Sequence, residues 1–182
     1  MNRLVRCGLA GLVATVLVGS TSTVPASSSA SSSGSGLDRL RSATAKYFDI
    51  DAATAEGRGA LEDAEGIACI DSDEGGMGVH YVRGDLVEDG QVRLRKPEAL
   101  IYEPRPDGYL ELVAVEYVVF RSAWRTEHPT GRPKLLGQRF ELVEEGNRYG
   151  LPAFFELHVW AWRHNPAGMF TDYNPRVTCK FA

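Results

Sequence analysis

His80, Glu116 and His158 are the residues of this sequence whose types and positions best suit chemistry. The two histidines fall in stretches that alternate in the manner of β-strands, and a further histidine, His164, follows shortly after the second stretch. Glu116 interrupts a long run that is otherwise apolar. Burying an ionised carboxylate without a partner is costly, so we expect another group to lie against Glu116.

Imidazole and carboxylate donors together suit zinc, iron, copper or manganese. If separate strands bring His80, Glu116 and His158 to one interior point, they can hold one divalent ion, with His164 or Glu156 as a further ligand. Three protein ligands and an open position would let a bound water ionise or a substrate coordinate, and a His/Glu pair could instead act as general base. The alternative is a structural network in which the histidines form hydrogen bonds in the core and Glu116 meets an arginine.

The strand expected over residues 154–163 has one polar and aromatic face. Side chains two positions apart on a strand share a face. That face carries Glu156, His158, Trp160, Trp162 and, if the strand continues, His164. Together with Tyr81 from an earlier strand, Glu156 and the two tryptophans could line a pocket for an apolar or ring-bearing ligand. Ordinary packing of the tryptophans is the alternative interpretation.

The elements that must position these residues are mostly strands. A helical pattern covers residues 37–57, with a break near Asp49 and with Asp51 as the cap of its second part. Strands are expected over residues 78–82, 98–102, 109–120, 135–144 and 154–163, and residues 121–134 are expected to form a loop. This order predicts a mainly β (α+β) fold, an antiparallel small barrel or half-barrel with the N-terminal helix packed on it.

The first residues have the pattern of an export signal. Two arginines precede the apolar run Leu9–Val18, which is shorter than the roughly 20 residues of a membrane span, and a small-residue cleavage site ends at Ala26. We therefore expect a signal peptide over residues 1–26, a secreted product and no stable membrane insertion after cleavage. Residues 27–36 are almost all Ser, Ala and Gly and predict a flexible linker, which leaves residues 37–182 as one domain.

Charge and cysteine content narrow the partners. The chain has 20 basic and 24 acidic residues and a net charge of −4. The charged residues of the expected signal peptide are all basic, so its removal makes the net charge more negative. This balance argues against a nucleic-acid partner and against an anionic membrane surface. Outside the signal peptide the cysteines are Cys69 and Cys179, and an isolated pair in an oxidising compartment predicts a disulfide. Thiolate ligation of a metal is the alternative, although no C-x-x-C spacing is present.

Three segments resemble a family of uncharacterised exported bacterial proteins. They are Gly76–Val82, Lys96–Pro104 and Glu156–Pro166, with the sequences GMGVHYV, KPEALIYEP and ELHVWAWRHNP. The resemblance covers about residues 43–177 and implies a self-standing exported domain, with no activity attached. The chain resembles less closely the cupin-like and allene-oxide-cyclase-like barrels, which carry His and Glu at inward-facing strand positions. It lacks the G-x-H-x-H motif of cupins.

Two functions from different classes follow from these patterns. The first is a secreted small-barrel protein that binds a metal ion or small ligand in a cavity lined by His, Glu and Trp side chains. The second is a non-catalytic secreted interaction module, or an envelope structural module, in which the same residues form a structural polar core. Fold analogy does not choose between them, nor does it decide whether the protein is an enzyme.

Overall fold

The computed structural model describes residues 28–182, with side chains from residue 34 onward, and the predicted signal peptide lies outside the described residues. Its first element is helix α1 (Ser28–Thr44), so the backbone of residues 28–36 is helical where the sequence predicts a linker. Leu40 is fully buried in the main core, and Arg41 Nε donates a 2.8 Å hydrogen bond to the carbonyl oxygen of Ala161. These contacts anchor the second half of α1. The preceding segment is mostly serine and includes Gly34 and Gly36, so it continues the helix although its residue types do not favour one.

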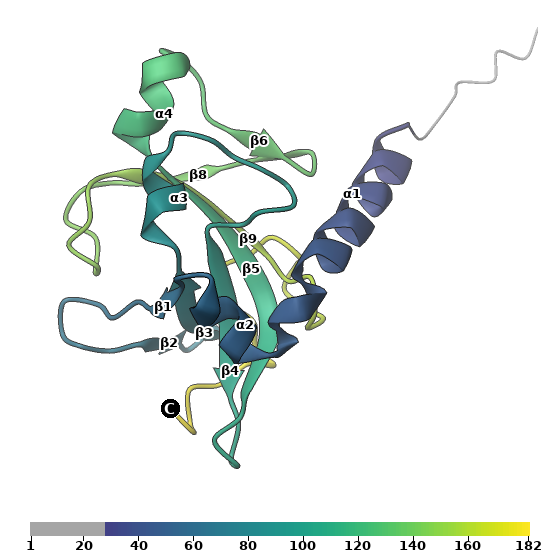
Figure 1. Cartoon of the computed structure of the whole chain (residues 1–182), viewed down its shortest axis with the longest axis vertical. Helices are drawn as coiled ribbons and strands as arrows, with labels where there is room; N and C mark the ends of the chain where they lie inside the picture. Colours follow the sequence, from purple (N-terminus) through teal and green to yellow (C-terminus); the bar gives the residue numbers. More distant parts are fainter. Residues whose placement is uncertain (1–27) are drawn as a thin grey trace, which may run out of the picture.

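A seven-stranded antiparallel sheet forms the centre of the fold, with β5 and β9 crossing the middle of the molecule (Figure 1). Its strands are β1 (Gly59–Ala60), β2 (Cys69–Ser72), β3 (Gly75–Val82), β4 (Ala99–Pro104), β5 (Leu110–Phe120), β8 (Glu141–Val143) and β9 (Phe154–Val159). They lie in the order β1-β3-β4-β5-β9-β8, and β2 also pairs with β3. The mainly β, antiparallel prediction is confirmed. The closed-barrel alternative is wrong, because no pairing among the described residues joins the short strands at the two ends of the sheet.

Two expected strands differ from the structure. The strand expected over residues 154–163 ends at Val159. The strand expected over residues 135–144 is divided into short pieces, because Leu136 and Gly137 both adopt positive φ and turn the chain. That turn joins the separate hairpin of β6 (Lys134–Leu135) and β7 (Gln138–Arg139), after which β8 returns to the main sheet.

The remaining helical elements are η1 (Ala45–Phe48), α2 (Ile50–Ala55), α3 (Gly84–Glu88) and α4 (Arg121–Glu127). The predicted helix break is present between η1 and α2, but the cap is Asp49, whose side chain accepts a hydrogen bond from the Asp51 amide. Helix α4 occupies the start of residues 121–134, which the sequence predicts as a loop. Within residues 28–182, no helix is both long enough and apolar enough for a membrane span.

The two faces of the sheet have different contents. The face that meets α1 and η1 forms the main core, which includes Leu40, Tyr47, Tyr102, Tyr117 and Phe155. Alternate residues of a strand point to opposite faces. Glu116 therefore points away from the main core while its neighbours Val115 and Tyr117 point into it. The opposite face of the sheet positions the candidate site.

The chain after β9 returns to the sheet beside β2 and β3. A disulfide joins Cys69 to Cys179, whose Cα atoms are 5.6 Å apart, so the predicted pairing is confirmed. Gly76 forms an isolated antiparallel bridge with Asn174. A Cβ atom at Gly75, where φ is 120°, would overlap the backbone of Asn174. A covalent bond and a close backbone contact thus hold this C-terminal tail (residues 160–182) on the sheet.

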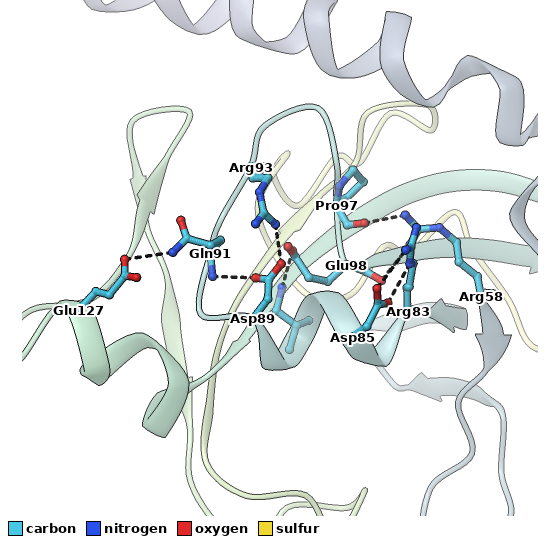
Figure 2. A network of polar contacts seen from close by, with 10 residues as sticks. Arg58, Arg83, Asp85, Asp89, Gln91, Arg93, Pro97, Glu98 and Glu127 are labelled. Atoms are coloured by element: carbon cyan, nitrogen blue, oxygen red, sulfur yellow. Dashed lines mark hydrogen bonds and ion pairs between the residues drawn. The ribbon is translucent and has the colours of Figure 1, made fainter. Parts of the chain in front are cut away.

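The buried carboxyl group of Glu98 lies just before β4 and contacts β5 (Figure 2). Glu98 is 0% exposed, and its Oε2 atom accepts a 3.1 Å hydrogen bond from the Val118 amide. Its backbone carbonyl accepts a 2.8 Å hydrogen bond from the guanidinium of Arg58, while its Oε1 atom has no partner among the described residues. Burial raises the pKa of Glu98 to about 8, in spite of the Val118 amide. The folded protein therefore holds this carboxyl group protonated at neutral pH.

Glu98→Gln is expected to flatten the pH dependence of stability. A carboxyl group with a folded pKa of about 8 and a model value of 4.5 favours folding fully below pH 4.5, and this contribution is lost as the pH rises to 8. Between pH 5 and pH 8 the wild-type protein should lose about 3 kcal/mol of unfolding free energy relative to the variant. Urea unfolding at several pH values measures this difference. Parallel pH curves for the two proteins would contradict the buried, protonated state.

Candidate metal centre

The sheet brings His80, Glu116 and His158 together from three strands. Glu116 on β5 lies directly opposite His158 on β9. On its other side Glu116 is opposite Ala99 of β4, and Ala99 is opposite Val82 of β3. His80 is two residues from Val82 and so shares its face of the sheet. Strand pairing therefore places the three side chains on one face of the sheet, with Glu116 and His158 on neighbouring strands and β4 between His80 and Glu116.

The donor atoms of these residues face one another. Nε2 of His80 lies 3.4 Å from Nε2 of His158 and 3.6 Å from Oε2 of Glu116. Each of the three residues offers one donor atom, and these three atoms all lie within 4.8 Å of one another. Two ligands bound tetrahedrally to zinc at its usual bond length lie about 3.3 Å apart, whereas two at a right angle lie about 3.0 Å apart. The two shortest separations are closer to the tetrahedral value.

All three side chains are buried, and the two histidines differ in protonation state. His80 is 3% exposed, His158 2% and Glu116 6%. Burial lowers the pKa of His80 to about 4, against the attraction of the Glu116 carboxylate. Burial also opposes charge on His158, but the surrounding carboxylates, Glu116 foremost, outweigh it and raise the pKa of His158 to about 9. His80 thus offers a free lone pair at neutral pH, whereas His158 must release a proton before it can ligate a metal.

Two further carboxyl groups surround the histidines. Asp172, in the C-terminal tail, places Oδ1 3.4 Å from Nδ1 of His158, although that buried nitrogen has no well-aligned hydrogen bond. The His158 ring lowers the pKa of Asp172. Burial, together with the charge of Glu116, raises the pKa of Glu156 to about 9. The Nε2 atom of His158 therefore faces His80, and its Nδ1 atom faces a carboxylate, which is the orientation that supports a histidine ligand.

Glu116 has no arginine partner among the described residues. Arg163, which could have filled this role, pairs instead with two other glutamates at 3.2 and 2.7 Å. Arg139 is exposed. The ion-pair contacts of Glu116 are with the two histidines, at 3.6 and 3.9 Å. The arrangement favours a metal centre over a structural core built on an arginine–glutamate pair.

A cavity of about 460 Å³ adjoins these residues. His80, Glu116, Glu156 and His158 all line it, so the structure brings four of the sequence-predicted site residues to one cavity. Most of the remaining wall is apolar and includes Val82, Val87, Val118, Phe120, Tyr149 and Phe154. Its size lies within the range of small-molecule sites.

The early end of β9 keeps two predicted site residues away from the cavity. The alternation that would place Trp160 and His164 beside His158 stops at Val159. Trp160 is buried in a small separate core, and its indole N–H donates a 2.6 Å hydrogen bond to the carbonyl of Thr171. His164 is exposed in the tail and is not in the group of donor atoms. Neither residue lines the cavity.

Tyr81 and Trp162 pack against the main core on the other side of the sheet. The ring of Tyr81 meets Tyr102 edge-on at 5.2 Å, and the indole of Trp162 meets Phe48 edge-on at 4.7 Å. Tyr81 follows His80 directly on β3, so it must point to the opposite face. The structure does not bring these two aromatic residues to the cavity.

The sequence interpretation misses Asp172 and Tyr149. Both lie in irregular segments, where no periodicity reports the direction of a side chain. One signal for Asp172 was available. A disulfide between Cys69 and Cys179 must bring the tail back to the part of the chain that precedes His80. Asp172 is seven residues before Cys179, so it returns with the tail.

No protein family model, no curated protein and no solved structure matches this chain. The proposal for the function of this protein therefore rests on the geometry of its own residues.

Proposed function

We propose that this protein binds one zinc ion through His80, Glu116 and His158. The observation that carries the proposal is the convergence of three buried donor atoms from three strands. All three lie within 4.8 Å of one another, and two of their separations, 3.4 and 3.6 Å, are near those of tetrahedral zinc ligands. Two imidazoles and one carboxylate also occur in iron(II) sites, and copper and manganese accept the same donors. We propose zinc among the four because two imidazoles and one glutamate are a ligand set of zinc sites that keep a fourth position open.

Three protein ligands leave one position of a tetrahedral zinc ion open. The donor residues line the cavity, so this position would face it and accept a water or the oxygen atom of a ligand. Zinc there would act as a Lewis acid and would lower the pKa of a bound water to about 7. The protein's own contribution is a set of buried donor side chains beside a mostly apolar cavity wall, and this surrounding of low polarity strengthens these electrostatic effects.

Metal content decides the proposal. Protein purified without an affinity tag should contain or take up one zinc per chain, measured by elemental analysis after EDTA treatment and titration with zinc. His164→Ala is the matched control, because His164 is exposed and lies outside the donor group, and this variant should bind zinc as the wild type does. Absence of stoichiometric uptake of zinc, iron, copper or manganese would refute the metal centre.

Asp172→Asn is expected to lower zinc affinity by 10–100-fold without removing a ligand. The Asp172 carboxylate lies 3.4 Å from Nδ1 of His158, where it fixes the ring orientation and increases the basicity of the other ring nitrogen. Competition with a chromophoric chelator measures the affinity. The exposed Asp71→Asn variant removes the same charge from β2 and should leave the affinity unchanged. Equal affinities for both variants would show that Asp172 does not position His158.

We also propose that the protein is exported. The disulfide supports this, because such bonds persist in oxidising compartments. The N-terminal pattern of arginines followed by a short apolar run supports it as well. Mass spectrometry of protein recovered from the medium should show a chain that begins at Ser27, and an intact N-terminus on intracellular protein alone would contradict export.

A further inference from the structure

The cavity beside the metal centre is polar at the metal centre and mostly apolar elsewhere, where Glu88, Asn147 and Arg148 are its other polar lining residues. Glu116 and Glu156 lie at the polar end, on paired strands. From Glu116 the same face of β5 continues with Val118 and Phe120, which both line the cavity. At about 3.3 Å per residue, Phe120 lies about 13 Å further along the strand than Glu116. The shape suits an elongated molecule with one polar end.

The volume sets the size of that molecule. A cavity of about 460 Å³ holds about 15 non-hydrogen atoms if each takes the roughly 30 Å³ that a water molecule occupies in the liquid. The apolar wall comes from β3, β5 and β9, from α3 and from the loop that contains Tyr149. For a molecule bound in this cavity, contact between its hydrocarbon and the apolar wall would therefore be the main source of affinity.

The charges around the polar end disfavour an anionic head group. Two carboxylates, from Glu116 and Asp172, lie against the two histidines there, and the Glu156 carboxyl group lines the cavity beside them. Arg148 is the one arginine or lysine among the described residues that line the cavity, and it is already paired with Asp63 at 2.9 Å. One divalent ion would not leave a surplus of positive charge for a carboxylate or phosphate ligand. An uncharged oxygen donor carries no such penalty.

We infer that the cavity binds an uncharged, mostly hydrocarbon molecule of about 10 to 15 non-hydrogen atoms whose single hydroxyl or carbonyl oxygen reaches the metal. The contact between this oxygen and the metal rests on the proposed zinc site. The contact between the hydrocarbon and the cavity wall does not. Such a molecule fills the apolar length of the cavity and supplies the fourth ligand at its polar end.

Calorimetric titration of the zinc-loaded protein with 1-decanol, 2-decanone and decanoate tests the inference. The alcohol and the ketone should bind at least tenfold more tightly than decanoate, which has the same chain length and a negative charge. Shortening the alcohol to 1-octanol should weaken binding about tenfold, as expected for the loss of two buried methylenes. In cobalt-substituted protein, 1-decanol should change the visible spectrum, because its oxygen enters the coordination sphere.

Two substitutions on β5 locate the binding site. Val118→Phe places a larger side chain in the cavity and should abolish decanol binding while zinc binding is retained. Leu110→Phe adds similar bulk on the same strand away from the cavity, against the main core, and should leave decanol binding unchanged. If Val118→Phe fails to fold, the comparison of decanol with decanoate on the wild-type protein still decides the inference.

The outcomes separate this inference from the proposed function. Stoichiometric zinc without binding of any of the three compounds would overturn the inference and leave the metal centre standing. If decanoate binds as tightly as 1-decanol or more tightly, the inference that the polar end of the bound molecule is uncharged would be overturned. Decanol binding to protein that takes up no zinc would contradict the proposed function and support the cavity occupant.

Discussion

His80→Ala is expected to lower zinc affinity by more than the 10–100-fold that loss of an outer partner of a ligand causes. His80 supplies one of three donor atoms, and its Nε2 atom makes both of the short contacts, to His158 and to Glu116. Burial keeps His80 neutral by lowering its pKa to about 4, so alanine leaves no unpaired buried charge behind. The variant should therefore fold, and the loss of affinity should report on ligation.

Chelator competition measures this loss, and circular dichroism of the metal-free variant confirms that the fold is retained. His164→Ala serves again as the control, because it removes an exposed imidazole from the same protein. If His80→Ala and His164→Ala bind zinc with the same affinity, the metal lies elsewhere. If His80→Ala alone loses zinc, the ligand set is supported.

Cys69→Ser combined with Cys179→Ser is expected to lower the unfolding free energy by about 4 kcal/mol. The disulfide closes a loop with a sequence separation of 110 residues, and a long loop restricts the unfolded chain strongly. It also holds the tail that carries Asp172 beside His158, so the double variant should bind zinc more weakly as well.

Denaturant unfolding of the double variant and of the wild-type protein in reductant measures this effect. Both should unfold at a similarly reduced denaturant concentration. An unchanged midpoint in the double variant would show that the tail is held on the sheet by its other contacts, such as the bridge between Gly76 and Asn174.

The sequence predicted the central part of the site because that part lies on regular strands. Glu116 stood out as a carboxylate in an apolar run, and its register opposite His158 follows from the pairing of β5 with β9. Period-two alternation reports the face of a side chain wherever a strand continues on both sides of it. His80, Glu116 and His158 meet this condition, and the structure brings them together.

The rest of the site depends on features that alternation does not report. The strand expected to run to residue 163 stops at Val159. Beyond Val159, alternation therefore no longer predicts which face of the sheet a side chain is on. Trp160 and Trp162 are therefore packing residues of two different cores. Tyr149 reaches the cavity from a loop, and its position depends on tertiary contacts that no local pattern reports.

The closed barrel was the main error at the level of the fold. Strand order and turn density in the sequence fit an open antiparallel sheet as well as a barrel. Closure depends on long strands at both edges, and the structure has β1 with two residues and β8 with three. Helix α1 likewise begins earlier than composition suggests, at Ser28.

Anomalous X-ray diffraction from zinc-loaded crystals tests the central claim most directly. The account predicts one zinc peak per chain at bond distances of about 2.0–2.2 Å from Nε2 of His80, Nε2 of His158 and a carboxylate oxygen of Glu116. A zinc peak at the exposed His164 with none between His80 and His158, or no peak at stoichiometric zinc, would contradict it.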